Sequence, residues 1–206
     1  MNTIKEIGEF IRKLSTNPNT NTVTNQYLDE KKQKNLRIYL TEMLGLNPKL
    51  LLLGEAPGYK GCAVSGIPFT SEYIMLENPN KTVIFGKDKG YEKISVSNFE
   101  KERTATMIWN ALIKLDKIPL LWNSFPFHPH KDRNPQSNRP PSNKETEIGK
   151  NYILHLENVF NIEHFIPVGR KAEKLLKNMN IKAEEYVPHP SRGNKSKFIE
   201  KLKTSF

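Results

Sequence analysis

The chain has 206 residues, enough for one domain with a sizeable core, and its 32 Lys and Arg exceed its 22 Asp and Glu to give a formal net charge of +10. Its single cysteine excludes an internal disulfide and cannot by itself hold a zinc site or an iron–sulfur cluster. Because the sequence has no long apolar run and no signal-like N-terminus, we predict a cytoplasmic protein with no membrane span. The basic excess favours a polyanionic partner, nucleic acid or an acidic membrane surface, although lysine also serves solubility alone.

The N-terminal part, residues 1–48, is predicted to be mainly helical. Apolar residues recur at helical spacing over 4–14, and a second helix is predicted over about 27–44, ending near Gly45. The segment 15–25 between them is rich in Asn and Thr, which predicts a loop.

Strands and helices alternate in the rest of the sequence. Short apolar runs bounded by turn signals predict buried strands, and segments with helical periodicity predict the helices between them. In chain order we expect a strand over 49–54, an irregular insertion over 77–100, a helix over 103–115, a strand over 119–123, a long loop over 124–142, a helix over 144–160, a strand over 164–169, a helix over 171–179, a short strand over 185–187 and a helix over 195–202. The alternation predicts an α/β fold, a three-layer α/β/α sandwich with a mostly parallel central sheet, in one domain over residues 1–206.

Three polar residues stand at or just after the ends of predicted strands. Glu55 follows the first strand, Asn123 ends the second, and His189 comes shortly after the last. Because parallel strands bring their carboxyl ends to one edge of the sheet, where α/β folds bind ligands, we expect these side chains to share a pocket.

This set of side chains suits recognition and release of a pyrimidine base. An Asn amide offers a donor beside an acceptor, which matches O4 and N3–H of uracil, and a His can donate to the opposite carbonyl oxygen, O2. A donor placed there in advance stabilises the negative charge that a departing base acquires when its glycosidic bond breaks. Phe69 offers a flat face on which a base can stack.

Four motifs occur in order along most of the chain. They are Gly54-Glu55-Ala56-Pro57-Gly58 with Gly66-Ile67-Pro68-Phe69 after it, Asn123 after its apolar strand, Ile166-Pro167-Val168-Gly169-Arg170-Lys171-Ala172, and His189-Pro190-Ser191. Together they resemble the uracil-DNA glycosylase superfamily, and the first motif is most similar to that of its thermophile-type family. The resemblance covers about residues 50–200.

The resemblance implies a monofunctional DNA glycosylase in DNA base excision repair. Such an enzyme flips uracil out of DNA and hydrolyses its N-glycosidic bond, leaving an abasic site. We expect it to need no cofactor or metal. We also expect a monomer that binds DNA and does not bind a membrane. The implied catalytic residues are Glu55, Asn123 and His189. Base binding falls on Gly54, Ala56, Pro57, Gly58, Tyr59, Phe69 and Asn123, and DNA contacts fall on Ser191, Arg192, Gly193, Asn194 and Lys195. Between Ser191 and the C-terminus basic residues outnumber acidic ones five to one, which suits binding of phosphates.

The sequence departs from the family pattern at three places. The thermophile-type enzymes carry four cysteines around an iron–sulfur cluster, whereas this chain has only Cys62, so the cluster is expected to be absent. In the best-known branch an aspartate that orients the water occupies the position of Ala56. Glu55 is the candidate to replace it, but neighbours on an extended strand point to opposite faces, so Glu55 either reaches the water through a twist of the loop or supports the loop. After His-Pro-Ser, some relatives place a leucine in the hole left by the base, and here Arg192 stands there.

Other interpretations stay open. The target can be another altered base, a deaminated purine or a modified phage base, because Ala56 and the 59–65 loop leave room, or the chain can be a catalytically silent DNA-binding relative. Taken singly, each motif also has a structural interpretation: a tight turn at the first, a core position for Phe69, a strand-end cap at Asn123 and a structural role for His189. We expect no metal at His128 and His130, which lack nearby Cys or carboxylate support. The loop over 133–142 is expected to be solvated, with contact to DNA as the alternative.

Overall fold

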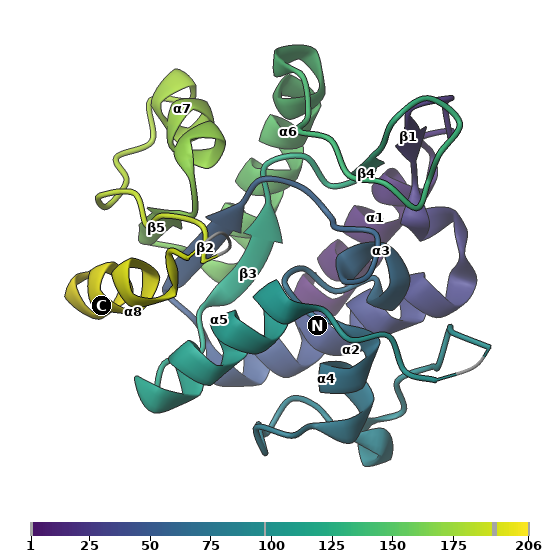
Figure 1. Cartoon of the computed structure of the whole chain (residues 1–206), viewed down its shortest axis with the longest axis horizontal. Coiled ribbons are helices and arrows are strands. Elements are labelled where there is room, and N and C mark those ends of the chain that lie inside the picture. Colours follow the sequence, from purple (N-terminus) through teal and green to yellow (C-terminus); the bar gives the residue numbers. More distant parts are fainter. Residues whose placement is uncertain (1, 97, 191–192, 206) are drawn as a thin grey trace.

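The computed structural model describes residues 2–96, 98–190 and 193–205. Helices and strands alternate through most of the chain (Figure 1). The main elements are α1 (Asn2–Ser15), α2 (Glu30–Leu46), β2 (Leu50–Gly54), α5 (Arg103–Lys114), β3 (Leu120–Asn123), α6 (Asn143–Phe160), β5 (His164–Pro167), α7 (Arg170–Asn178) and α8 (Lys195–Thr204). The shorter ones are β1 (Val23–Thr24), η1 (Gln26–Leu28), α3 (Cys62–Ser65), α4 (Glu72–Glu77), η2 (Lys87–Lys89) and β4 (His128–Pro129).

Three parallel strands form the central sheet, in the order β3-β2-β5. Leu53 of β2 pairs with Trp122 on one side and with Pro167 on the other, so the three carboxyl ends meet at one edge. Leu51, Leu52 and Leu53 of β2 are buried because helices cover both faces of the sheet, which explains why the strand is apolar throughout rather than alternating. The predicted α/β class and parallel sheet are confirmed.

The predicted short strand over 185–187 is wrong as a regular strand. Only Val187 forms a parallel bridge, with Val168 just beyond β5. The N–H of Glu184 donates to Phe165 O, and the N–H of Val187 donates to Pro167 O. From the first bond to the second, the chain advances by three residues in the C-terminal segment but by only two residues in β5. This mismatch prevents a regular ladder, and Pro188 has no N–H to continue it. The segment nevertheless lies alongside β5 and leads to the same edge of the sheet.

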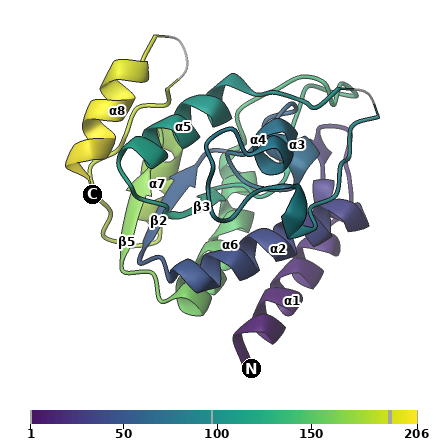
Figure 2. The ribbon, with the colours of Figure 1, turned by 90° about the horizontal axis from the view of Figure 1, so that it is seen from below.

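Helices lie on both faces of the sheet. In Figure 2, α5 and α8 lie on one side and α6 on the other, and α1 packs on α6 while α7 packs on β5 and α6. The helix α2 covers the free edge of β3, where the N–H of Leu121 donates to the hydroxyl of Tyr39 at 2.9 Å. In the described part of the chain, no helix is both long and apolar enough to cross a membrane.

Helix ends follow local side-chain caps. Asp29 accepts from two N–H groups at the start of α2, Glu102 does the same for α5, and Ser142 forms a capping box with Glu145 at the start of α6. The predicted end of the second helix near Gly45 agrees with the structure, in which the helix ends at Leu46 and closes on the left-handed Asn47.

Two segments predicted as loops, 15–25 and 124–142, pair with each other. In the small antiparallel sheet, Val23 of β1 pairs with Pro129 of β4 and Thr24 pairs with His128. The N–H of His130 also donates to Thr22 O at 2.9 Å. The N-terminal part is therefore tied to the long loop that follows β3, beside the carboxyl edge of the central sheet.

The insertion over 77–100 is irregular, as predicted, apart from the end of α4 and the single turn of η2. Buried polar side chains hold it. The carboxylate of Glu72 accepts from the N–H groups of Ile94 and Ser95, and the amide of Asn35 bonds both backbone groups of Glu92. These contacts satisfy backbone groups that no regular element pairs.

Candidate active site

A cavity of about 620 Å³ opens at the carboxyl edge of the central sheet. Among its lining residues are Glu55, Asn123 and His189, the three residues predicted from the sequence to share a pocket. The further expected residues on its wall are Ala56, Gly58, Phe69 and Asn194. Gly54, Pro57 and Tyr59 are next to these residues in the chain but are not among the described residues that line the cavity.

Gly54 ends β2 where the strand, Phe69 and Asn123 come closest together. A Cβ added at Gly54 would lie 2.2 Å from Phe69 Cζ and 2.7 Å from Asn123 Oδ1. Only a residue without a side chain leaves these two groups where they are. The glycine that opens the first motif therefore lets the aromatic ring and the amide lie side by side at the cavity wall.

Phe69 reaches the cavity from a strained turn. Its φ of 54° lies in the left-handed region, which is rare for aromatic residues. The turn is held by buried hydrogen bonds: Ser65 Oγ donates to Thr70 O at 2.6 Å, and the indole N–H of Trp109 in α5 donates to the hydroxyl of Thr70 at 3.1 Å. A conformation that costs about 1–3 kcal/mol persists only where the surrounding structure fixes it, and such positions cluster at functional sites.

Asn123 presents a buried amide at the cavity wall. Only 4% of the residue is exposed, and within the described residues its side chain has no hydrogen bond. The next residue holds the two strands together, because both the N–H and the hydroxyl of Ser124 donate to Gly54 O, at 2.8 and 2.7 Å. Asn123 is thus fixed by its backbone, and it lies on the cavity wall.

Glu55 and Ala56 both line the cavity, although they are adjacent in sequence. The strand ends at Gly54, so the backbone beyond it is no longer extended and the alternation of faces no longer applies. The carbonyl of Glu55 accepts from the N–H of Phe125 at 3.0 Å, which ties this loop to the one after β3. Burial raises the pKa of the Glu55 carboxyl above its ordinary value, and the nearby charge of Lys171 opposes this effect.

His189 enters the cavity from the segment that follows Val187. It is partly buried and stands between Pro188 and Pro190, whose rings limit the rotation of the backbone. The pairing of Val187 with Val168 brings this segment to the carboxyl edge of the sheet.

The expected DNA-contacting residues follow His189. Gly193 is exposed with a φ of 84°, Asn194 lines the cavity just before α8, and Lys195 is the exposed first residue of that helix. Ser191 and Arg192 lie outside the described residues. A basic, exposed segment therefore lies directly beside the mouth of the cavity.

The rest of the cavity wall was not predicted from the sequence. Glu102 and Thr104 contribute from the start of α5, and Asn138, Arg139 and Pro140 contribute from the loop over 133–142, which was expected to be solvated. The side chain of Asn138 accepts from the N–H of Tyr59 at 3.1 Å, joining this loop to the first motif. Gly61 and Cys62 complete the wall, and burial raises the pKa of the Cys62 thiol to about 12, so it is not a reactive thiolate.

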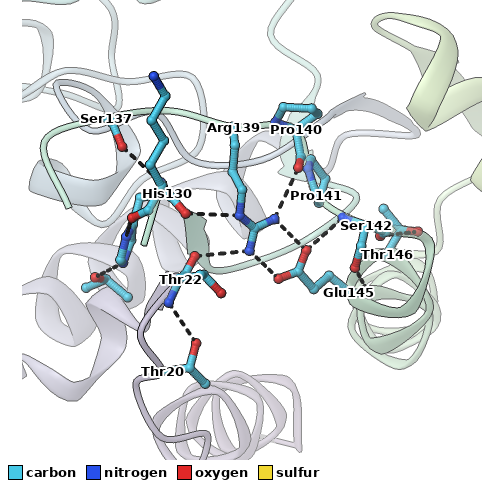
Figure 3. Close-up of polar contacts among 12 residues, drawn as sticks. Thr20, Thr22, His130, Ser137, Arg139, Pro140, Pro141, Ser142, Glu145 and Thr146 are labelled. Carbon is cyan, nitrogen blue, oxygen red and sulfur yellow. Dashed lines mark hydrogen bonds and ion pairs between the residues drawn. The ribbon is translucent and has the colours of Figure 1, made fainter. Parts of the chain in front are cut away.

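Arg139 organises this loop (Figure 3). Its guanidinium donates to both carboxylate oxygens of Glu145, at 2.6 and 2.8 Å, and to the carbonyl oxygens of Thr22, His130 and Pro140. The charge-assisted bonds to Arg139 lower the pKa of Glu145 to about 2. The capping box of Ser142 and Glu145 is a sequence pattern from which the role of Glu145 at the start of α6 could have been predicted. No local sequence pattern indicates the role of Arg139.

His128 and His130 are structural. The ring of His128 lies between the carbonyl oxygens of Pro57, at 2.8 Å, and Pro135, at 2.9 Å, and so joins the first motif to the long loop. The ring of His130 lies between Thr24 and the Lys131 carbonyl. Among the described residues there is no group of three or more His, Cys, Asp or Glu able to hold a metal ion.

Comparison with known proteins gives a family and a fold. The family model described as "Uracil DNA glycosylase superfamily" matches residues 42–205. The structure is similar to the crystal structure of wild-type SMUG2 from Pedobacter heparinus, with a TM-score of 0.60 and 16% sequence identity over 98% of this chain and 96% of that chain. At that identity the likeness concerns the fold. No curated protein matches the chain significantly. The family match includes Glu55, Asn123 and His189.

Proposed function

The chain belongs to the uracil DNA glycosylase superfamily, and we propose that it is a monofunctional DNA glycosylase that hydrolyses the N-glycosidic bond of uracil flipped out of DNA. The observation that carries this proposal is the convergence of Glu55, Asn123 and His189 on one cavity, with Phe69 on its wall. The ends of β2 and β3 and the segment after Val187, which are far apart in sequence, supply these groups, as base recognition and bond cleavage at one place require.

Asn123 is the proposed reader of the base. Its amide is buried and makes no hydrogen bond within the described residues, so base binding satisfies a polar group that is otherwise left without a partner. The donor and acceptor of the amide match O4 and N3–H of uracil. The ring of Phe69, held next to this amide by the absence of a side chain at Gly54, provides the surface on which the base stacks.

His189 and Glu55 are the proposed catalytic groups. When the C1′–N1 bond breaks, its electron pair passes to the base, and a hydrogen bond from His189 to O2 stabilises the resulting anion. Water then bonds to C1′ and transfers a proton to the Glu55 carboxylate. The partial burial of Glu55 suits this role, because a raised pKa makes the carboxylate a better base. The products are free base, which takes up a proton, and an abasic site. No strand cleavage is proposed.

The exposed segment from Gly193 to the start of α8 is the proposed DNA-binding surface. Lys195 and Lys197 are exposed there, and Asn194 lines the cavity between them and His189. Cations in this place can hold the phosphates on either side of a flipped nucleotide. DNA contacts by Ser191 and Arg192, which lie outside the described residues, are proposed from the sequence alone.

A second candidate substrate class is an altered base larger than uracil. The observation that favours it is the space on one side of the cavity: a Cβ added at Gly58 meets no atom within 4 Å, and Ala56 beside it is small. A substituent on the base would therefore meet little resistance on this side. The same fold could also bind DNA without acting on it.

Single-turnover assays on oligonucleotides separate these possibilities. Matched duplexes and single strands would carry uracil, a 5-substituted uracil, hypoxanthine or xanthine at one position. Abasic sites only with uracil support the proposal, and abasic sites only with a larger base support the second candidate. Tight binding without any base release would contradict both and leave a DNA-binding protein.

A further inference from the structure

Two lysines near the cavity lie over aromatic rings. The ammonium group of Lys101 is 4.2 Å from the centre of the Tyr73 ring, and that of Lys60 is 5.7 Å from the centre of the Tyr59 ring. The N–H of Tyr73 donates to Glu100 O at 3.1 Å, which fixes this ring beside the chain that carries Lys101. Both lysines are exposed and both tyrosines are partly buried. Attraction to the face of a ring therefore restricts two otherwise flexible side chains.

The two lysine–tyrosine pairs adjoin each other at the cavity. Lys60 is followed by Gly61 and Lys101 is followed by Glu102, and both of these next residues line the cavity. A Cβ added at Gly61 would lie 3.4 Å from Glu102 Cγ. The segments that carry the two lysines therefore meet at the edge of the cavity.

No carboxylate neutralises Lys60 or Lys101. Within the described residues, neither lysine forms an ion pair within 4 Å. Lys87 shows the contrasting case, because it lies 5.7 Å from the centre of the Phe99 ring but also pairs with Glu77 at 2.7 Å. A ring orders a lysine and leaves its charge in place, whereas a carboxylate cancels that charge. Lys60 and Lys101 are therefore ordered cations that an external anion can bind.

The acidic residues beside Lys101 do not reverse this charge. The carboxylate of Glu102 accepts from the N–H groups of Thr104 and Ala105, at 2.8 and 2.7 Å, and so faces the positive end of the α5 dipole. The exposed Arg103 adds a further cation next to Glu102. This part of the cavity edge is therefore basic, as binding of phosphates requires.

These pairs and the start of α8 lie on different sides of α5. Figures 1 and 2 both show α3 and α4 on one side of α5 and α8 on the other. Lys60 comes shortly before α3, and Tyr73 belongs to α4, whereas Asn194 precedes α8 and lines the cavity. A DNA strand that places one nucleotide in the cavity continues from the mouth in two directions, so its phosphates can meet cations on both sides.

We propose that Tyr59, Lys60, Tyr73 and Lys101 form a second DNA-binding surface, the lysine–tyrosine rim. The rings order the two ammonium groups, and these bind backbone phosphates on the side of the flipped nucleotide away from α8. The inference rests on the proposed function, because that function makes DNA the partner of the cavity. It assigns no contact with the base to the rim.

Separate variants test the charges and a ring. Lys60→Gln with Lys101→Gln removes both charges, Tyr73→Leu removes one ring, and Tyr73→Phe keeps that ring. The matched control is Lys114→Gln with Lys117→Gln, because both of these lysines are exposed and lie at or just beyond the opposite end of α5. Fluorescence anisotropy would measure binding of duplexes without uracil across a salt series, with melting temperatures on the same preparations.

The double lysine variant should bind duplexes of any sequence more weakly than the control. Its log–log salt slope should be lower by about 1.8, because each lost phosphate contact lowers the slope by about 0.9. Tyr73→Leu should bind about twofold to fivefold more weakly than Tyr73→Phe, as expected for loss of an exposed cation–π contact. A slope in the lysine variant equal to that of the control would overturn the rim, and equal binding by the two Tyr73 variants would overturn the role of the ring.

This design distinguishes failure of the rim from failure of the proposed function. The binding measurements require neither uracil nor activity, and single-turnover excision would be measured separately. A lower slope confined to the lysine variant supports the rim even if uracil is never released, in which case the proposed function alone fails. Excision by a lysine variant whose binding equals that of the control overturns the rim and leaves the proposed function in place. A protein that binds no DNA overturns both.

Discussion

Gly54 and Asn123 are register partners on adjacent strands, and a Cβ on Gly54 would lie 2.7 Å from the side-chain oxygen of Asn123. The same Cβ would lie 2.2 Å from the ring of Phe69. A missing side chain at the end of β2 therefore sets the relative position of the amide proposed to read the base and the ring proposed to stack on it.

Gly54→Ala should abolish most of the uracil excision. The new methyl group must displace Phe69 or Asn123, and overpacking of this kind typically destabilises a protein by about 1–3 kcal/mol. Gly45→Ala is the matched control, because a Cβ there meets nothing within 4 Å and Gly45 lies in α2, outside the described cavity lining. Single-turnover rates and urea unfolding of both variants check this. Equal activity of the two variants would contradict the close approach at Gly54.

Asn123→Asp should shift preference from uracil toward cytosine and lower the overall rate. The change replaces an amide donor by an acceptor, and cytosine has a donor, the 4-amino group, where uracil has the O4 acceptor. Competition between oligonucleotides with uracil or cytosine opposite guanine measures the preference. Asn123→Ala provides the comparison without either group, and wild-type uracil excision by that variant would remove Asn123 from base recognition.

The ion pair of Arg139 and Glu145 should stabilise the protein only above acidic pH. The folded-state pKa of Glu145 is lowered from 4.5 to about 2, so the stabilisation is complete above about pH 4.5 and is lost as the pH falls toward 2. At pH 7, Glu145→Gln should lower the free energy of unfolding by about 2 kcal/mol, as expected for charge-assisted hydrogen bonds. Chemical denaturation as a function of pH measures this difference.

Glu147→Gln is the control for that experiment. Glu147 lies on the same helix and pairs with Lys150, but its side chain is 49% exposed. Exposed pairs contribute about 0–1 kcal/mol, so this variant should differ little from the unmodified protein at any pH. A pH-independent loss in Glu145→Gln would show that the loss comes from packing rather than from the ion pair.

DNA binding should weaken when charge is reversed beside the cavity. Lys195→Glu with Lys197→Glu should reduce affinity for duplexes of any sequence and flatten the salt dependence, because each lost phosphate contact lowers the log–log slope by about 0.9. Lys117→Glu is the control at the opposite edge of the sheet, near Pro119. Fluorescence anisotropy across a salt series measures both quantities. The same loss in Lys117→Glu would mean that net charge, not this surface, drives binding.

The sheet and its functional edge were predictable because local signals agree there. The leucine run of β2 and the apolar residues of β3 are buried on both faces, a pattern that follows from sequence composition alone. Once parallel strands are inferred, the ends at Glu55, Asn123 and the segment before His189 must meet at one edge. The sequence did not determine the face to which Glu55 points, because the backbone after Gly54 leaves the extended conformation.

The walls of the cavity depend on contacts between distant segments, which local patterns do not report. The β1–β4 pairing joins two segments that each read as loops, since two-residue strands have too few residues for a periodic signal. Arg139 on the same loop is held by carbonyl oxygens that no side-chain pattern indicates.

The decisive experiment is single-turnover release of uracil by His189→Ala, with melting temperature and DNA affinity measured on the same preparation. A donor that acts on the departing base works mainly in the transition state, so the variant should fold and bind DNA normally but lose about a hundredfold to a thousandfold in rate. A variant that melts at the normal temperature and releases uracil at an undiminished rate would contradict the catalytic role of His189. Lower stability with normal activity per folded molecule would contradict it equally and leave His189 a structural residue.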